Sequence, residues 1–509
     1  MRAGSYRGTC ASLAAATLAL VAASACGGSQ PPPQAPVKPV ASAVQKPAAK
    51  PATGQKLGVS VGPEASELTG DAKSAYDRGF QAWMSGDLQT AKSAFSDAAR
   101  KAPSAGGPRY SLGCVLERLG DTQGALDAYR AAYTANAKYE VALGAHAVLL
   151  AETGHGAEAE QLLSDKLAQT PDSAALMTYK AEVKSIEGDS PGCQLLAQQA
   201  LAKQPDFKDA MVVIARDHYR THRWDLARYA LQAILDGADD GSIPARDKGN
   251  AEALLLRGLI EREIGQRKQA LADFDLALQK RPDLFEAYVN LGEMKLEAGN
   301  ASEAQDPLEK ATRYAPNVPV AHLDLGDCYR LLGRPGDSKA ELEKAIAMDS
   351  TLAGVHYDLG LLYLFSPGVP GAAGQDDQLA KAIKEFETYK SMRGAKAPKG
   401  QGEDVDELLS TAKRKQSELQ LKKQAAASEP APAATAVPTA APAATAAPTA
   451  AAPAPPPATP AAAASKPAAA APPVKAAAPA KRTAPAKAGT TKPATTTGGS
   501  SGNIIRQLP

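Results

Sequence analysis

The chain has 509 residues, of which 42 are glycine and 39 are proline, and aromatic residues make up only 5%. Its 57 basic and 55 acidic side chains leave a formal net charge of +2, so bulk charge does not indicate a nucleic-acid partner. The five cysteines, at positions 10, 26, 114, 193 and 328, include no C-x-x-C pair, which argues against a zinc site or a disulfide framework. We expect Cys114, Cys193 and Cys328 to be small packed side chains.

The first residues have the pattern of an export signal. Arg2 and Arg7 give a positively charged start, and an apolar run over residues 11–21 follows that is too short for a membrane span. Small residues come next, at positions 23–25. This order of features predicts that residues 1–25 are a secretory signal peptide.

Cys26 follows in the context Ala-Ser-Ala-Cys-Gly-Gly. This context resembles a bacterial lipobox, whose cysteine becomes the lipidated first residue of the mature chain, although Ala23 stands where a large apolar residue is usual. The same residues fit an ordinary A-x-A cleavage signal, so simple secretion stays an alternative. The resemblance implies the outer membrane, because Gly27 replaces the Asp that marks inner-membrane retention. A lipidated cysteine with more than one acyl chain is enough for stable anchoring.

Residues 26–70 are rich in Pro, Ala, Lys and Gln. A segment of this composition buries too little apolar surface to fold, so we expect an extended linker. It would hold the following residues away from the bilayer.

Residues 71–400 contain a repeat with a fixed period, which is clearest from 251 to 350. By subtraction, Gly258, Gly292 and Gly326 are each 34 residues apart. Two amphipathic segments lie within each period. A period of this length is typical of a solenoid, in which each unit buries its apolar face against its neighbours. The same spacing links further positions: Gly265, Gly299 and Gly333, and Pro282 with Pro316.

The register extends in both directions, with two slips. Toward the N-terminus it includes Gly79 and Gly113, and it weakens where Ala147, Ala181 and Ala215 hold the glycine position. One insertion falls around residues 236–250. A second insertion, at residues 365–378, shifts the expected second helix of the last repeat to residues 379–392. Insertions of this kind map to loops at the edge of a solenoid.

Two segments follow the repeats. Residues 403–424 read as one more amphipathic helix, so we assign 401–424 as a capping helix, which a solenoid needs at its end. Residues 425–509 are mostly Ala, Pro and Thr with scattered basic side chains, which predicts a disordered tail.

The repeated residues resemble the tetratricopeptide repeat (TPR). The resemblance implies an all-α fold, a right-handed superhelix of about nine helix pairs, whose concave face holds an extended peptide or a helix of another protein. The full set of basic residues with which some relatives clamp a C-terminal carboxylate is missing, so an apolar ligand with some basic character is expected; the alternative is that the charges only solvate this face. The family's concave positions correspond here to Glu252, Leu255, Leu259, Arg262, Glu286, Val289, Glu293, Glu297, Leu323, Asp327 and Arg330.

No motif indicates an enzyme or a cofactor site. His218 and His222 have helical spacing for a shared metal, but the glutamate of the metalloprotease signature is absent. His322 and His356 are expected to pack between helices. The loop from Asp236 to Asp247 resembles a calcium-binding loop but lacks several of the residues that usually coordinate the ion. Phosphate-binding, dinucleotide-binding and nucleophile-elbow motifs are absent from the sequence.

The sequence therefore predicts a lipid-anchored scaffold or adaptor of the bacterial cell envelope, facing the periplasm from the outer membrane. It would bind protein segments through its groove. One alternative is an assembly factor of a pilus, secretion or gliding-motility machine. Another is binding of peptidoglycan or polysaccharide through the basic tail.

Overall fold

The computed structural model describes residues 68–237, 241–242, 244–393 and 405–428. All of these described residues belong to one compact unit. The predicted signal peptide, Cys26, most of the linker and the tail from residue 429 lie outside the described residues. Among the described helices, none combines the length and the apolar character needed to span a bilayer.

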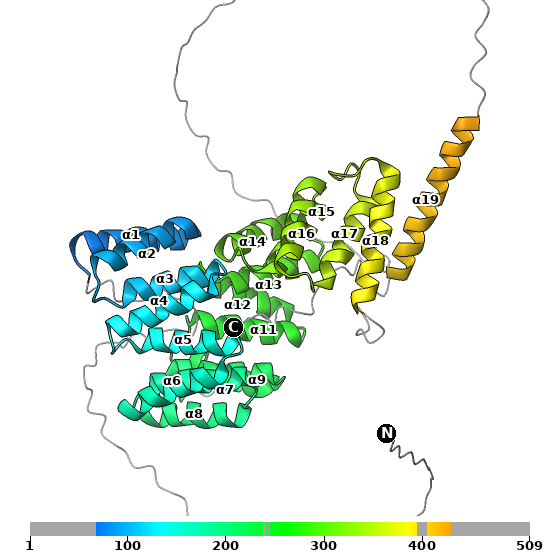
Figure 1. Ribbon diagram of the computed structural model, residues 1–509. Helices are drawn as coiled ribbons and strands as arrows, with labels where there is room; N and C mark the ends of the chain where they lie inside the picture. Colours follow the sequence, from blue (N-terminus) through cyan, green and yellow to red (C-terminus); the bar gives the residue numbers. More distant parts are fainter. Residues whose placement is uncertain (1–67, 238–240, 243, 394–404, 429–509) are drawn as a thin grey trace, which may run out of the picture. The chain divides into compact units, whose positions relative to one another are not determined.

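The described residues form nineteen α-helices, and their single β-bridge joins Gly237 to Pro244 (Figure 1). The first ten helices are α1 (Gly70–Ser85), α2 (Leu88–Lys101), α3 (Gly107–Arg118), α4 (Thr122–Ala135), α5 (Glu140–Glu152), α6 (Gly156–Gln169), α7 (Ala174–Ile186), α8 (Ser190–Lys203), α9 (Lys208–Arg220) and α10 (Trp224–Leu235). The others are α11 (Ala251–Glu263), α12 (Arg267–Lys280), α13 (Phe285–Glu297), α14 (Ala301–Tyr314), α15 (Pro319–Leu331), α16 (Pro335–Met348), α17 (Ala353–Phe365), α18 (Gln375–Arg393) and α19 (Val405–Ser428).

Each odd-numbered helix from α1 to α17 packs against the even-numbered helix that follows it, and α19 packs on α18. The described part of the chain is thus a solenoid of nine helix pairs with one additional terminal helix, as predicted. Its core is built largely from Ala and Leu, and Cys114, Cys193 and Cys328 are free thiols that are completely buried in it, which confirms their packing role.

A glycine in the first helix of a pair allows the second helix to approach closely. A Cβ atom at Gly258 in α11 would lie 2.6 Å from the ring of Phe274 in α12, which is completely buried. Any larger residue at this position would therefore push the two helices apart. The same close approach joins Gly79 to Phe95, Gly113 to Tyr129, and Gly360 to Phe386.

A second glycine ends the first helix of most pairs in the left-handed conformation. Gly265, two residues after the end of α11, has a φ of 80°, and its N–H donates to the carbonyl oxygen of Arg262 at 3.1 Å. In the fifth repeat His222 takes this position with a φ of 57°, and it alone has a positive φ among the described residues other than glycine.

The two predicted insertions fall between helices. The first separates α10, which ends at Leu235, from α11, which begins at Ala251. The second lies between α17 and α18. Helix α18 begins at Gln375, earlier than the predicted 379, because the Asp377 carboxylate accepts a hydrogen bond from the Ala373 N–H at 2.8 Å and so stabilises the first turn.

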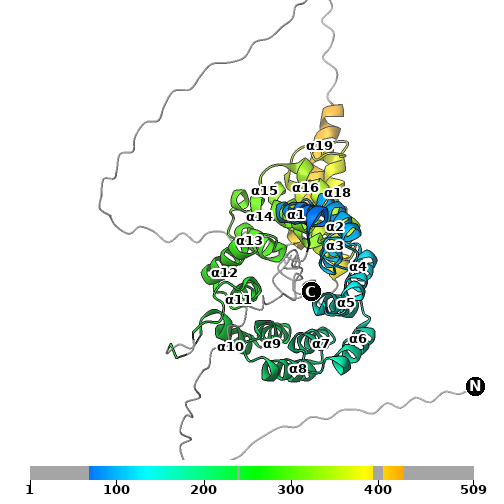
Figure 2. The same ribbon diagram turned by 90° about the vertical axis from the view of Figure 1, so that its left-hand side faces the viewer.

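The helix pairs curve into an arc (Figure 2). The first helices α5, α7, α9, α11 and α13 lie towards the centre of this arc, and α6, α8, α10 and α12 lie outside them. The arc brings α1 and α3 back to α13 and α14, so that residues about two hundred positions apart in the sequence are in contact.

Candidate protein-binding face

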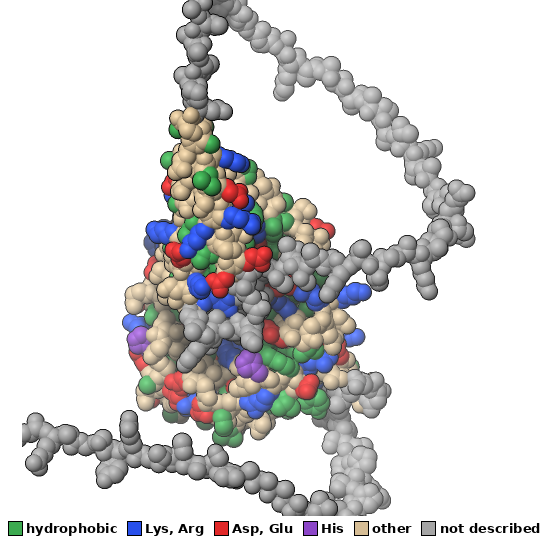
Figure 3. All heavy atoms as spheres, turned by 90° about the vertical axis from the view of Figure 1, so that its right-hand side faces the viewer, with side chains coloured by type: hydrophobic (Ala, Val, Ile, Leu, Met, Phe, Trp, Pro, Cys, Tyr) green, Lys and Arg blue, Asp and Glu red, His purple; other side chains and the backbone are tan. Residues whose placement is uncertain are grey.

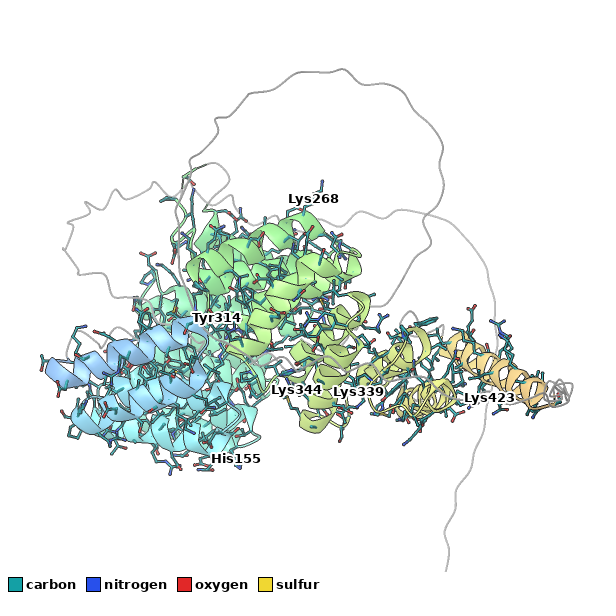
Figure 4. The ribbon with its side chains drawn as sticks, turned by 90° about the horizontal axis from the view of Figure 1, so that it is seen from above. His155, Lys268, Tyr314, Lys339, Lys344 and Lys423 are labelled. Atoms are coloured by element: carbon teal, nitrogen blue, oxygen red, sulfur yellow. The ribbon has the colours of Figure 1, made fainter. Side chains whose placement is uncertain are left out.

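The first helices of consecutive repeats adjoin one another on the side of the arc that we call the inner face. Side chains that connect one first helix to the next lie along this face. By contrast, Figure 4 shows Lys268, which follows the first residue of α12, and His155, next to α6, at the outer edge of the helices. The inner face is the surface on which the concave residues were predicted.

A series of ion pairs connects α7, α9 and α11 on the inner face. The Glu182 carboxylate of α7 pairs with Arg216 at 3.2 Å and with Arg220 at 2.8 Å, both from α9. Arg216 also lies 3.6 Å from Glu252 of α11. Although burial alone would raise it, the positive charges of Arg216 and Arg220 hold the pKa of Glu182 below its ordinary value. These first helices are therefore joined by buried charges as well as by apolar packing.

The series continues to the start of α13. Glu252 pairs with Arg281 at 3.4 Å, and Arg281 pairs with Asp283 at 2.8 Å. Arg281 and Asp283 are each only 5% exposed, so both charges need their partners. We use the name charge belt for Glu182, Arg216, Arg220, Glu252, Arg281 and Asp283.

Two carboxyl groups beside the charge belt make no hydrogen bond or ion pair with the described residues. One is Glu152, at the end of α5, whose side chain is exposed; the other is Asp209, in the first turn of α9, which is half-buried. Loss of hydration among the surrounding helices, together with the negative charges of Glu117 and Glu182, raises the pKa of Glu152 to about 8. Dehydration and the charge of Glu252 raise the pKa of Asp209 to about 7.

Repeats seven to nine contribute a second group of acidic residues, which we call the acidic cluster: Glu293, Asp324, Asp327 and Asp358. Burial raises the pKa of all three aspartates, and the positive charges of Arg262 and Arg330 offset this only in part. The Asp324 side chain is 4% exposed, and its Oδ2 has no hydrogen-bond partner among the described residues. The cluster therefore contains more carboxyl groups than the two neighbouring arginines can pair with.

The predicted concave residues divide into two kinds. Leu259, Val289 and Leu323 are buried in the core, and Leu255 is partly buried against it. The charged ones pair with other side chains of the same solenoid, so any role in binding a partner stays a prediction. The pairs are Glu252 with Arg216 and Arg281, Arg262 with Glu293 and Glu297, Glu286 with Arg118, and Asp327 with Arg330.

The sequence did not predict the inner-face residues of the middle repeats, because the repeat pattern is weakest there. The signal was present in the register. Glu182 and Arg216 directly follow Ala181 and Ala215, just as Glu293 follows Gly292. The register also places Glu152 five residues after Ala147, the same offset by which Glu297 follows Gly292.

Three of the residues considered for metal binding, His222, Asp236 and Asp247, have other contacts, whereas the Nδ1 of His218 has no hydrogen-bond partner among the described residues. His222 packs edge-on against Trp224, with ring centroids 5.0 Å apart. Asp236 pairs with Arg257 at 2.9 Å and Asp247 with Lys208 at 3.4 Å, while residues 238–240 and 243 of this loop are not described. The described residues contain no group of three or more His, Cys, Asp or Glu side chains that could hold a metal.

The two histidines expected to pack between helices are bonded to carboxylates. His322 is 4% exposed, and its Nδ1 lies 2.6 Å from Glu341 while its Nε2 lies 3.0 Å from the carbonyl oxygen of Pro316. The Nδ1 of His356 lies 2.6 Å from Glu385. Both rings therefore serve to hold first helices against neighbouring elements.

The outer surface offers a second, apolar area. A shallow depression of about 480 Å³ is lined by His222, Trp224, Leu226 and Ile264 among others, and Tyr229 of α10 is 75% exposed. On the face that includes α18 and α19, basic and acidic side chains are interspersed (Figure 3). That face therefore presents no broad region of a single charge sign among its described residues.

Comparison with known proteins agrees with the helix-pair architecture. A family model described as tetratricopeptide repeat matches residues 76–140 and 289–353. No match was found among curated proteins.

Three solved structures are among those to which this chain is similar. The chain is similar to the Cut9–Hcn1 hetero-tetramer of the APC/C, with 14% identity over 68% of this chain and a TM-score of 0.47, and it spans 65% of the length of that chain. It is also similar to a tetratricopeptide repeat protein from Parabacteroides merdae, with 15% identity over 57% of this chain and 98% of the other and a TM-score of 0.28. A MamA protein matches with 18% identity over 35% of this chain and 93% of its own, with a TM-score of 0.28. The nine helix pairs and the two stretches matched by the family model show that this chain contains tetratricopeptide repeats.

Proposed function

We propose that this protein is a lipid-anchored scaffold of the bacterial cell envelope, which binds segments of other proteins on its inner face. Tetratricopeptide repeats serve as surfaces for protein–protein interaction, and the repeats here form one continuous solenoid. The observation that carries the proposal is the pair of unpartnered carboxyls on the inner face, Glu152 and Asp209.

The chemistry of these two groups indicates the kind of ligand. A carboxyl whose pKa is raised by partial loss of hydration and by neighbouring negative charges is less stable in its ionised form. An ammonium or guanidinium group placed beside it would relieve that cost and form a charge-assisted hydrogen bond. The expected ligand is therefore a protein segment with Lys or Arg side chains, and its binding should release protons near neutral pH.

Capture of partners from native envelopes tests the binding proposal. Chemical crosslinking followed by identification of the captured proteins should give adducts with the wild-type chain that decrease strongly in the double variant Glu152→Gln and Asp209→Asn. The matched control is Glu158→Gln, which changes an exposed carboxyl in α6. Equal capture by the double variant and the control would refute binding at these carboxyls.

Anchoring rests on the lipobox-like context of Cys26. Growth with a fatty-acid analogue should label the wild-type protein and leave Cys26→Ser unlabelled. An unlabelled wild-type protein would instead indicate simple export. This experiment does not depend on the identity of the partner.

Cell-wall binding is a second candidate, which the composition of the tail favours. After Glu429 the sequence has no acidic residue, while it includes Lys475, Lys481, Arg482 and Lys487. Deletion of residues 425–509 should abolish sedimentation with peptidoglycan if the tail binds the wall. Under the scaffold proposal, the deletion leaves partner capture by residues 72–400 unchanged.

A further inference from the structure

The two ends of the arc meet in a contact that we call the seam. One side is formed by the C-terminal ends of α1 and α3, and the other by the start of α13, the end of α14 and the loop that follows it. The Trp83 Nε1 donates to the Asp283 carboxylate at 3.3 Å, and the Tyr314 hydroxyl donates to the carbonyl oxygen of Met84 at 2.8 Å. Figure 4 shows Tyr314 where α14 meets the end of α1.

Arg118 of α3 lies at the centre of the seam. Its guanidinium carbon is 4.3 Å from the ring centroid of Phe285 and 5.9 Å from that of Trp83. It also faces the Glu286 carboxylate at 3.8 Å. An arginine against two aromatic rings and one carboxylate is a favourable arrangement only while these groups stay together.

The charges of the seam are incompletely satisfied. Arg118 and Glu286 are each 8% exposed, yet their separation of 3.8 Å is too long for a hydrogen bond. The Arg118 Nε and the Glu286 Oε2 have no hydrogen-bond partner among the described residues. Burying such groups costs much of what their attraction contributes, so the Arg118–Glu286 pair adds little to the stability of the closed seam.

The seam is also continuous with the inner face. Asp283, which accepts the Trp83 hydrogen bond, is the last residue of the charge belt and pairs with Arg281. Arg281 in turn shares Glu252 with Arg216. Asp283 Oδ2 is the oxygen that accepts from both Arg281 and Trp83, so a ligand cation that binds this oxygen competes directly with the Trp83 Nε1 hydrogen bond.

We propose that the seam is a reversible clasp, and that basic segments binding to the inner face favour its open state. This inference rests on the proposed function, because it assigns a means of entry to the same face. With the clasp closed, α1 and α3 are held to α13 and α14; with it open, the inner face is accessible from the side. In the open state Glu286 loses Arg118 and Asp283 loses Trp83, while Asp283 keeps its pair with Arg281.

The chain contains a native probe of the clasp. Of its two tryptophans, Trp83 is 3% exposed in the seam, whereas Trp224 lies on α10, outside the seam. The substitution Trp224→Phe in the full-length protein leaves Trp83 as the sole source of tryptophan fluorescence. Acrylamide quenching then reports directly on how often Trp83 is exposed.

Three comparisons test the clasp in this single-tryptophan protein. Tyr314→Phe removes one bond across the seam, so the open population should rise about fivefold and quenching should increase. The matched control Tyr229→Phe, on α10, should leave quenching unchanged. Titration with a hexa-arginine peptide should increase quenching with a midpoint that rises with salt, while hexa-glutamate at equal ionic strength should have no effect.

The outcomes separate the clasp from the proposed function. Circular dichroism must show that Tyr314→Phe has the same helix content as the parent protein. If it does not, the hexa-arginine titration of the parent protein still tests whether the clasp opens. A Trp83 that stays protected in the titration overturns the clasp, even if partner capture still depends on Glu152 and Asp209. A responsive Trp83 with capture independent of those carboxyls supports the clasp and removes the proposed binding site.

Discussion

Trp83 and Asp283 are 200 residues apart in sequence, and yet the indole Nε1 of the first donates a hydrogen bond to the carboxylate of the second. This bond joins the first repeat to the seventh. It is possible only because the intervening repeats curve through an arc that returns to its start. The arrangement of the whole inner face depends on this curvature.

The close approach of paired helices predicts a specific sensitivity at Gly258. Gly258→Ala should lower the free energy of unfolding by about 1–3 kcal/mol, because the new methyl group would overlap the Phe274 ring. In the background Phe274→Ala the same substitution should cost much less. Gly336→Ala is the control, since a methyl group there meets only Pro370, at an ordinary 3.6 Å. Equal costs of Gly258→Ala in both backgrounds, measured by denaturant titration, would contradict the packing account.

The left-handed residue of the fifth repeat predicts a stabilising substitution. His222→Gly should raise the thermal midpoint, because glycine removes a backbone strain of about 1 kcal/mol at a φ of 57°. His222→Ala loses the same contact with Trp224 but keeps the strained backbone, so it should be less stable than both. If the alanine and glycine variants melt at the same temperature, backbone strain at this position is negligible.

A buried histidine predicts how stability depends on pH. Burial, with a contribution from the positive charge of Arg130, lowers the pKa of His146 to about 4, and its Nδ1 lies 3.0 Å from the Tyr133 hydroxyl. Between its ordinary pKa and about 4 the unfolded chain binds the proton and the folded chain does not, so stability should fall as pH decreases through this range.

The variant His146→Phe isolates this effect. Relative to the variant, the wild type should lose about 2 kcal/mol of stability between pH 7 and pH 5. Denaturant titrations at the two pH values provide the measurement. Parallel pH profiles for the two proteins would mean that His146 is not the group responsible.

The charge belt predicts a large effect of removing one cation. Arg216→Met leaves Glu182, only 1% exposed, with Arg220 as its remaining partner and removes one of the two partners of Glu252, so it should cost about 3 kcal/mol. Arg130→Met removes an exposed pair with Asp127 and should cost less than about 1 kcal/mol. Thermal unfolding of the two variants side by side should show this difference. Similar losses in both would mean that the belt is not a buried network.

The sequence predicted the features that depend on contacts within one repeat or between neighbouring repeats. The period identified Gly258 and Gly265 as repeated positions, because their roles depend on residues within one or two repeats, but it did not predict that Gly258 would face Phe274. It located both insertions for the same reason. The amphipathic pattern predicted the terminal helix, and Val405 and Ala412 are the buried residues of α19.

The seam and the charge belt could not be predicted in this way. The contact between Trp83 and Asp283 depends on the small rotation of each repeat relative to the previous one, summed over six repeats. A periodic sequence pattern does not reveal the size of these rotations. Sequence reasoning likewise assigned Glu286 and Glu293 to ligand binding, since a charge on a family's concave position looks the same whether its partner is a ligand or Arg118 or Arg262.

Photo-crosslinking from single positions in native envelopes tests most directly whether the inner face binds a partner. A photoreactive residue at position 152 lies on the inner face, and one at Lys268 lies on the outer edge of the solenoid (Figure 4). Our account predicts protein adducts from position 152, reduced by an excess of hexa-arginine peptide, and none from position 268. Adducts from position 268 with none from position 152 would contradict it.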